Sequence, residues 1–310
     1  NSTIEIKGKK VGKMHPPYIV AEMSGNHNGS LSTAIEIIKQ AKASGADAVK
    51  IQTYTPDTIT INHDGPDFVV NKGLWGGRKL YELYKEAHTP WEWHKDLFDY
   101  SRKIGITLFS SPFDKTAIEF LEKLNNPVYK IASPELIDLE LIKEVAKTNK
   151  PIILSTGMAT YVEIQEAINT AREEGCNQII VLHCTSAYPA PIEEANLSTI
   201  QEIKRNFNVI SGLSDHTQGT IVSKVATALG ASLIEKHFTL DRSTGGVDSK
   251  FSIEPYELRE LVDHTSLVYK SIGRPAFKPT ESESTSLRNR RSLYITKSVK
   301  KGEVIKSENI

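Results

Sequence analysis

The chain has 310 residues, and its 38 Lys and Arg residues balance its 38 Asp and Glu residues, so the formal net charge at pH 7 is zero. No long run of one charge and no stretch near the ~18 apolar residues of a membrane span is present, so neither nucleic acid nor a membrane is expected as a partner. This length allows one large domain or two ordinary ones.

The chain contains two cysteines, Cys176 and Cys184, which are too few for a disulfide framework. We therefore expect reduced thiols and a cytoplasmic location. Cys184 lies within an apolar run, so its side chain is predicted to be packed rather than reactive.

In chain order, a short β segment predicted within residues 1–14 precedes a long strand and helix repeat. Eight apolar, β-branched runs each end in a polar or charged residue, and each is followed by a helical pattern. The runs cover residues 18–24, 48–54, 106–112, 128–133, 151–157, 178–186, 208–217 and 232–240. The helical patterns cover residues 31–45, 91–105, 116–125, 139–149, 161–175, 197–207, 220–230 and 254–273. Eight such units over about 270 residues predict the α/β class and one closed (β/α)8 TIM barrel, with the first segment closing its bottom.

One connection is much longer than the others. Residues 55–90, between the second run and its helix, are rich in Gly, Pro, Asp and aromatic residues. Connections of this length in a compact domain are usually functional or disordered. Trp75, Tyr81 and Tyr84 argue against disorder, so we expect a segment that covers the substrate.

The barrel is expected to span residues 1–273, followed by a polar, Pro-containing linker over residues 274–286. Residues 287–310 resume an alternating pattern typical of β-strands. So short a stretch cannot form a domain alone. It is either the opening of a small β-rich domain or a strand that lies on the barrel.

Two histidines end neighbouring strands of the predicted barrel. His216 ends the seventh run and His237 lies in the eighth, and adjacent strand ends lie on the order of 5 Å apart. Both imidazoles could therefore reach one metal ion, which would keep open positions for water or substrate. The alternative is two unrelated histidines that make hydrogen bonds.

Lys50 and Lys130 lie near the ends of the second and fourth runs. A lysine within a barrel strand is costly to bury without an anionic partner. The lysines could form a phosphate or carboxylate site with serines at other strand ends, namely Ser110, Ser133, Ser155 and Ser214. Two alternatives stay open: pairing with carboxylates such as Glu22 or Glu135, or a lysine that acts as a Schiff-base nucleophile.

Three carboxylates are candidates for acid and base chemistry. Glu22 and Glu135 lie near strand ends, and Asp248 lies in the Gly-containing segment after the eighth run. Carboxyl groups near a barrel rim can transfer protons. The alternative for each is a role as a salt-bridge partner.

Several longer motifs resemble those of the bacterial sialic-acid synthase family, which condenses phosphoenolpyruvate with an amino sugar. They are AEMSGNHNGS (21–30), ADAVKIQTYTPDTIT (46–60), TPWEWH (89–94), FSSPFD (109–114), YKIASPE (129–135), ILSTGMAT (153–160), GLSDHT (212–217) and IEKHFTLDR (234–242). The resemblance runs from residue 17 to the end of the chain. YTPDTIT, GLWGG and HTPWEWH look most like the pseudaminate branch of the family, with the N-acetylneuraminate and legionaminate branches as alternatives.

The resemblance implies roles for the site residues. His216 and His237 would hold a divalent metal ion, Mn²⁺ or Mg²⁺. The two lysines and the four serines named above would hold phosphoenolpyruvate. The residues expected to face an N-acetylated amino sugar are Glu22, Gln52, Glu135, Tyr188 and Asp248, and the three carboxylates among them are the catalytic candidates.

The resemblance also implies a homodimer with exchanged C-terminal domains. Residues 287–310 would be the beginning of a small antifreeze-like (SAF) domain that covers the partner's active site. Two other functions stay open on the sequence: a metal-free class I aldolase that uses Lys130 as its Schiff base, and a carbohydrate-binding protein without catalytic activity.

Overall fold

The computed structural model describes residues 3–310. Its centre is a closed barrel of eight parallel strands that follow one another in chain order, with the last strand beside the first. The strands are β3 (Tyr18–Glu22), β4 (Ala48–Thr53), β5 (Thr107–Pro112), β6 (Tyr129–Ile131), β7 (Ile152–Ser155), β8 (Ile179–Cys184), β9 (Ile210–Asp215) and β10 (Leu233–His237). Each predicted run contains one strand, so the predicted (β/α)8 fold is confirmed.

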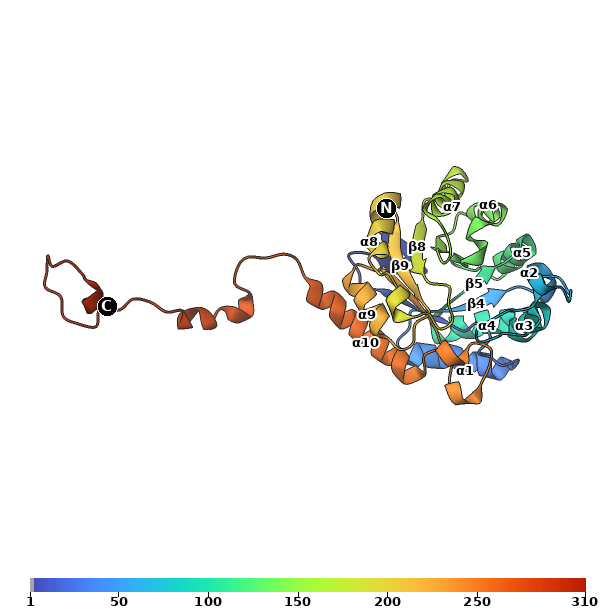
Figure 1. Ribbon diagram of the computed structural model, residues 1–310, viewed down its shortest axis with the longest axis horizontal. Helices are drawn as coiled ribbons and strands as arrows, with labels where there is room; N and C mark the ends of the chain where they lie inside the picture. The colour runs from blue at the N-terminus through green and yellow to red at the C-terminus, as the bar shows by residue number, and fades with distance from the viewer. Residues whose placement is uncertain (1–2) are drawn as a thin grey trace. The chain divides into compact units, whose positions relative to one another are not determined.

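Helices surround the barrel strands (Figure 1). The predicted helices correspond to α1 (Leu31–Ala43), α4 (Trp91–Ile104), α5 (Lys115–Lys123), α6 (Leu139–Ala146), α7 (Tyr161–Glu173), α8 (Thr199–Phe207), α9 (Ile221–Ala228) and α10 (Pro255–Ile272). Local polar residues fix several starts: Asp114 accepts backbone hydrogen bonds at the start of α5, and Thr160 and Glu163 form a capping box on α7. Among the described residues, no helix combines the length and the apolar character that crossing a bilayer requires.

An N-terminal hairpin packs against one end of the barrel interior. β1 (Thr3–Ile6) and β2 (Lys9–Gly12) pair antiparallel. Ile6 of this hairpin belongs to the same buried cluster as Tyr18 and Leu233, the first residues of β3 and β10. The β segment predicted near the N-terminus is therefore confirmed from residue 3 onward, while the two residues before it lie outside the described part.

The strand register sets which side chains meet at the C-terminal end of the barrel. Glu22 lies opposite His237 on one side and opposite Lys50 on the other. Side chains along a strand alternate between the barrel interior and the helix layer. Glu235 and His237 therefore face the interior together, whereas Lys236 between them pairs with a carboxylate that also contacts α9.

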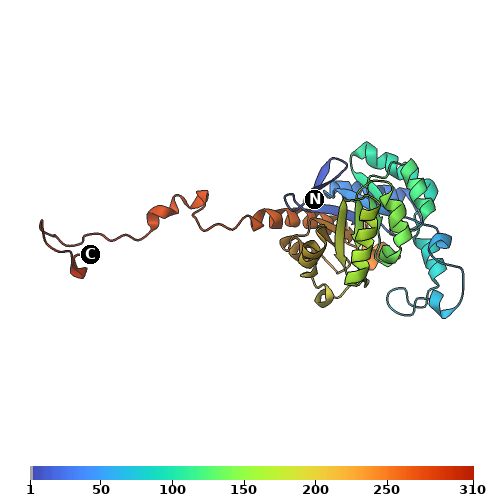
Figure 2. The same cartoon turned by 90° about the horizontal axis from the view of Figure 1, so that it is seen from above.

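The long segment 55–90 is folded. It contains α2 (Pro56–Ile59) and α3 (Leu80–Ala87), and Figure 2 shows it, in light blue, extending past the barrel helices. The indole Nε1–H of Trp75 donates to the carbonyl of Val247 at 2.7 Å. This bond ties the segment to the connection that follows β10.

The chain divides into two compact units, the first ending at Ile272 and the second covering Gly273–Ile310. The second unit contains three single-turn 3-10 helices, Glu281–Glu283, Ser286–Asn289 and Ser307–Asn309. Within residues 3–310, no strand follows β10. The β-rich domain expected to begin at residue 287 therefore stays a prediction.

Candidate active site

A cavity of about 470 Å³ opens at the C-terminal ends of the barrel strands. All but one of the site residues predicted from the sequence line it: Glu22, Lys50, Gln52, Lys130, Ser133, Glu135, Ser155, Tyr188, Ser214, His216, His237 and Asp248. The exception is Ser110, whose hydroxyl lies 2.5 Å from Thr53 Oγ1 and 3.1 Å from the carbonyl oxygen of Ile51. Because these contacts within the barrel occupy the Ser110 hydroxyl, the geometry does not support its predicted contact with phosphoenolpyruvate.

Two lysines and two glutamates form the charged floor of the cavity (Glu22, Lys50, Lys130 and Glu235), and all four are buried. Lys50 Nζ lies 3.0 Å from Glu235 Oε1 and 3.3 Å from Glu22 Oε2. Lys130 Nζ lies 3.2 Å from the same oxygen of Glu235, and the Ser214 hydroxyl donates to it at 3.3 Å. The lysines are thus paired with internal acids, but mainly with Glu235 rather than with Glu22 or Glu135.

The net charge of the charged floor depends on the protonation of Glu22. Burial raises the pKa of Glu22, although Lys50 opposes the change. Burial would also raise the pKa of Glu235, but Lys130 and Lys50 outweigh it and hold that pKa well below its usual range. With Glu235 ionised, a proton on Glu22 leaves two ammonium groups against one carboxylate charge, whereas an ionised Glu22 makes the floor neutral. The floor can therefore accept an anion.

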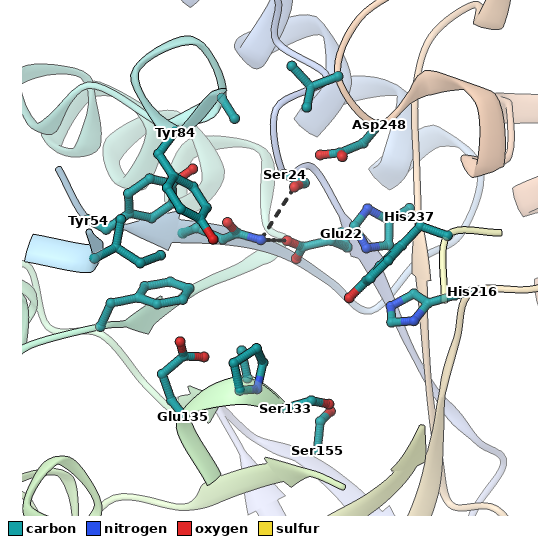
Figure 3. Close-up of a pocket in the computed structure, with 18 of the residues that line it drawn as sticks. Glu22, Ser24, Tyr54, Tyr84, Ser133, Glu135, Ser155, His216, His237 and Asp248 are labelled. Atoms are coloured by element: carbon teal, nitrogen blue, oxygen red, sulfur yellow. Dashed lines mark hydrogen bonds between the residues drawn. The ribbon is translucent and has the colours of Figure 1, made fainter. Parts of the chain in front are cut away.

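Two serine hydroxyls lie beside the floor, and Figure 3 shows them close together at the ends of their strands. Ser133 Oγ accepts a hydrogen bond from the backbone N–H of Gly157 at 3.0 Å. Ser155 Oγ is buried without a hydrogen-bond partner among the described residues. A buried hydroxyl without a partner is costly, and a ligand that accepts its hydrogen bond would remove the cost.

His216 directly follows β9, and His237 is the last residue of the neighbouring strand β10. Their ring centroids are 5.3 Å apart, and Figure 3 shows both rings on one side of the cavity. His216 Nδ1 lies 2.9 Å from the carbonyl oxygen of Thr185. This nitrogen must be the N–H donor, so Nε2 carries a lone pair whenever the ring is neutral, although the pKa of His216, which burial would lower, is raised by the neighbouring Cys184. Burial is the main cause that lowers the pKa of His237, and the neighbouring His216 lowers it further. His237 is therefore neutral, the form in which imidazole binds metals.

The imidazole pair (His216 and His237) fits a divalent cation held by two protein ligands. Metal-binding histidines commonly donate their second ring N–H to a carbonyl, as His216 does to Thr185. His237 Nδ1 is buried and lacks a hydrogen-bond partner within residues 3–310. In that part of the chain no group of three or more His, Cys, Asp and Glu could hold a metal ion. A cation here would therefore complete its coordination with substrate or water.

The three predicted carboxylates border the same space. Gln52 Nε2 donates to Glu22 Oε1 at 2.8 Å, and Asp248 accepts from the backbone N–H of Gly25 at 3.1 Å. Glu135 Oε2 is buried without a partner among the described residues, and burial raises the pKa of Glu135 to about 7. A carboxyl group with this pKa can donate and accept protons near neutral pH, so Glu135 is an acid and base candidate, as is Glu22, whose pKa burial also raises to about 7.

Several polar lining residues were missed by the sequence interpretation, among them Glu235 and Cys184. Glu235 lies two positions before His237, so the period of two along a strand places both on one face and could have identified it. Cys184 is buried, as predicted, but it also lines the cavity, with Sγ 3.7 Å from His216 Nδ1. Its place at the end of β8 was the available signal.

The segment 55–90 supplies an apolar wall to the cavity. We define this wall by its lining residues, Ile59, Val70, Trp75, Leu80, Leu83, Tyr84 and Ala87. The sequence predicted that the segment covers the substrate, but not which of its side chains face the cavity.

The fold and the site define a class: a (β/α)8-barrel enzyme with an anion-binding floor beside an imidazole pair suited to a cation. A model of the NeuB family matches residues 37–276. The pseudaminic acid synthase of Campylobacter jejuni subsp. jejuni serotype O:23/36 (strain 81-176) is 47% identical over 296 residues, which cover 94% of this chain and 85% of that protein. The pseudaminic acid synthase of Helicobacter pylori is 45% identical over 299 residues, which cover 96% of this chain and 88% of that protein.

Solved structures agree with these relatives. The crystal structure of N-acetylneuraminic acid synthetase from Leptospira borgpetersenii matches with a TM-score of 0.82 and 32% identity, covering 94% of this chain and 97% of that chain. The chain therefore belongs to the NeuB family, and the resemblance seen in its motifs is confirmed. It is an enzyme of the sialic-acid synthase type.

Proposed function

We propose that the enzyme is a pseudaminic acid synthase. It condenses phosphoenolpyruvate with 2,4-diacetamido-2,4,6-trideoxy-L-altrose and water to give pseudaminate and phosphate. The observation that carries this proposal is the meeting of the charged floor and the imidazole pair in one cavity. The identity with two pseudaminic acid synthases supports the choice of sugar.

The charged floor and the serines would bind phosphoenolpyruvate. Lys50 and Lys130 neutralise its phosphate and carboxylate groups through charge-assisted hydrogen bonds. Glu235 holds both ammonium groups in place before the anion arrives, so little reorganisation is needed during the reaction. Further hydrogen bonds come from hydroxyl groups at three strand ends, those of Ser133, Ser155 and Ser214.

The sugar would lie above the floor, with Gln52 and Tyr188 among its contacts. A divalent ion, Mn²⁺ or Mg²⁺, held by His216 and His237 would supply Lewis acidity toward the aldehyde group. C3 of phosphoenolpyruvate bonds to the aldehyde carbon, water adds at C2, and cleavage of the C2–O bond releases phosphate. The water loses a proton and the aldehyde oxygen gains one.

Glu135 is suited to these proton transfers because its pKa is about 7. Glu22 and Asp248 are the other candidates. The ionisation of Glu22 also determines how much positive charge the floor keeps, so a proton on Glu22 would favour binding of the anion.

The Schiff-base alternative requires a neutral Lys130 amine. Burial lowers the pKa of Lys130, which favours this chemistry. However, the ion pair with Glu235 at 3.2 Å stabilises the ammonium form, and an ammonium group is not a nucleophile. Borohydride treatment in the presence of pyruvate should therefore leave no covalent adduct on Lys130.

We also propose that two copies associate, and that the SAF domain beginning at residue 287 covers the partner's cavity. The family resemblance of the motifs supports this arrangement. Size-exclusion chromatography with light scattering on the full-length chain should give the mass of a dimer.

A panel of amino sugars, each assayed with phosphoenolpyruvate and Mn²⁺, tests the proposed reaction. Phosphate release should require the diacetamido altrose and should stop with EDTA. Release without sugar, or release that EDTA does not diminish, would contradict the proposal. A preference for N-acetylmannosamine would instead assign an N-acetylneuraminate synthase. A preference for a diacetamido mannose would assign a legionaminate synthase.

A further inference from the structure

The apolar stripe of α3 borders the cavity rather than the barrel core. Leu80, Leu83, Tyr84 and Ala87 recur at the spacing of one helix face, and all four line the cavity. An amphipathic helix usually turns such a stripe toward a hydrophobic core. Here the stripe borders a space that also contains two buried lysines, so it is placed to contact a ligand that is both charged and partly apolar.

The part of the apolar wall on α3 lies across the cavity from the imidazole pair. Figure 3 shows Tyr84 of α3, together with Tyr54, on the side opposite His216 and His237. Trp75 lies nearer the imidazole side: its ring centroid is 5.5 Å from that of Tyr188, which packs on His216, and its indole N–H donates to the Val247 carbonyl. The cavity therefore has a reactive side on β9 and β10 and an apolar side on the segment after β4.

If the proposed function holds, this arrangement fixes which end of the sugar chain faces the imidazole pair. The aldehyde carbon must lie at the imidazole pair and the charged floor, because the new carbon–carbon bond forms there. The rest of the sugar chain then extends toward the opposite side. The carbon farthest from the aldehyde, C6, reaches the apolar wall.

We propose that the apolar wall binds the C6 methyl group of a 6-deoxy sugar and selects against sugars that carry a hydroxyl at C6. Within the wall, Ile59, Val70 and Leu80 contain no side-chain hydrogen-bonding atoms, and the indole N–H of Trp75 already donates to Val247, so the Tyr84 hydroxyl is the polar group that remains. A C6 hydroxyl placed against Ile59, Val70 and Leu80 would lose its hydrogen bonds to water without replacement. A C6 methyl group would gain from its burial.

The test compares two sugars that differ only at C6: 2,4-diacetamido-2,4,6-trideoxy-L-altrose and its 6-hydroxy analogue. The wild-type enzyme should favour the 6-deoxy sugar in kcat/KM by roughly 10- to 100-fold, the range over which apolar pockets reject an added hydroxyl. Ile59→Thr and Val70→Thr each place a hydroxyl in the wall that can bond the sugar hydroxyl. Each should lower this preference by about 3- to 10-fold.

Ile61→Thr is the matched control. Ile61 lies two positions from Ile59 in the same segment, but its side chain is 58% exposed and is not part of the wall. The preference should stay at the wild-type value in this variant. Thermal unfolding with and without phosphoenolpyruvate checks that each variant is folded with an intact floor. Val70→Thr, which nearly keeps the shape of the side chain, decides the test should Ile59→Thr fail to fold.

The outcomes separate this inference from the proposed function. A wild-type enzyme that condenses neither sugar with phosphoenolpyruvate contradicts the proposed function. A wild-type enzyme that uses the 6-deoxy sugar, with the same preference in Val70→Thr as in Ile61→Thr, overturns the role of the apolar wall and leaves the proposed function intact. Equal use of both sugars by the wild-type enzyme also overturns it.

Discussion

The charged floor and the apolar wall border the same cavity, but they are built differently. The floor side chains project from strands. The backbone pairing of neighbouring strands, which places Glu22 between His237 and Lys50, fixes the positions of these side chains. The wall comes from one long connection, which is braced by the bridge between Val69 and Lys79 and by the indole of Trp75. Groups that stabilise developing charge need the precision of the barrel, whereas a connection can change without disturbing the fold. We therefore expect the floor to determine the chemistry and the wall to determine the substrate.

The largest effect should follow removal of a floor lysine. Lys130→Met deletes one of the two positive charges proposed to bind phosphoenolpyruvate, so kcat/KM should fall by about 1,000-fold, as for the loss of a preorganised donor. Lys150→Met is the control, because Lys150 pairs with Glu122 at 2.6 Å outside the cavity. Steady-state phosphate release measures both variants. A Lys130→Met enzyme within tenfold of the wild type would remove the floor from the proposed chemistry.

The next effect concerns the carboxylate between the lysines. Glu235→Gln leaves two buried ammonium groups without their shared partner, so the free energy of unfolding should fall by roughly 3 kcal/mol. Because phosphoenolpyruvate supplies new negative charge, it should raise the melting temperature more in this variant than in the wild type. Glu122→Gln, at a side chain 39% exposed, is the matched control and should cost at most about 1 kcal/mol. An equal ligand-induced shift in both proteins would show that Glu235 does not position the lysines.

A smaller, pH-dependent effect is expected at Glu135. Its pKa of about 7 in the folded protein lies above the reference value of 4.5, so the folded state keeps a proton that the unfolded state releases. The stabilisation is complete below the unfolded-state pKa and disappears as pH rises to the folded-state pKa. Between pH 5 and pH 8 the wild type should therefore lose roughly 2 kcal/mol relative to Glu135→Gln. Melting curves at several pH values measure this difference, and a difference that stays constant with pH would contradict the shift.

The smallest effect should come from the wall. Trp75→Phe removes the indole bond to the Val247 carbonyl, an interaction worth about 1 kcal/mol, so KM for the sugar should rise by roughly 2- to 5-fold while kcat changes little. Trp91→Phe is the control: Trp91 does not line the cavity, although its indole N–H donates to the carbonyl of the lining residue Tyr54 at 3.1 Å, so KM should rise less than in Trp75→Phe. A fall in kcat for Trp75→Phe as large as that for a floor lysine would contradict the division of roles.

Much of the site was predictable because barrel topology converts positions in the chain into positions in space. Lys50, Lys130 and His237 lie near strand ends, and the fold brings such ends to one rim. Ser110 looked equivalent to the other serines, but its hydroxyl bonds Thr53 and the Ile51 carbonyl. Whether a residue near a strand end reaches the cavity depends on the tilt and the length of the strand. The apolar runs of the sequence reveal neither property.

The sequence alone determined the barrel, the order of its strands and the end at which its polar residues gather, because each depends on local periodicity and on chain connectivity. The tertiary structure decided which groups touch. Glu235 became the shared partner of Lys50 and Lys130 only when β4, β6 and β10 converged in the closed barrel. The face of α3 that borders the cavity was likewise set by where the segment 55–90 packs. Contacts between distant segments depend on the closure of the whole barrel, which no local pattern encodes.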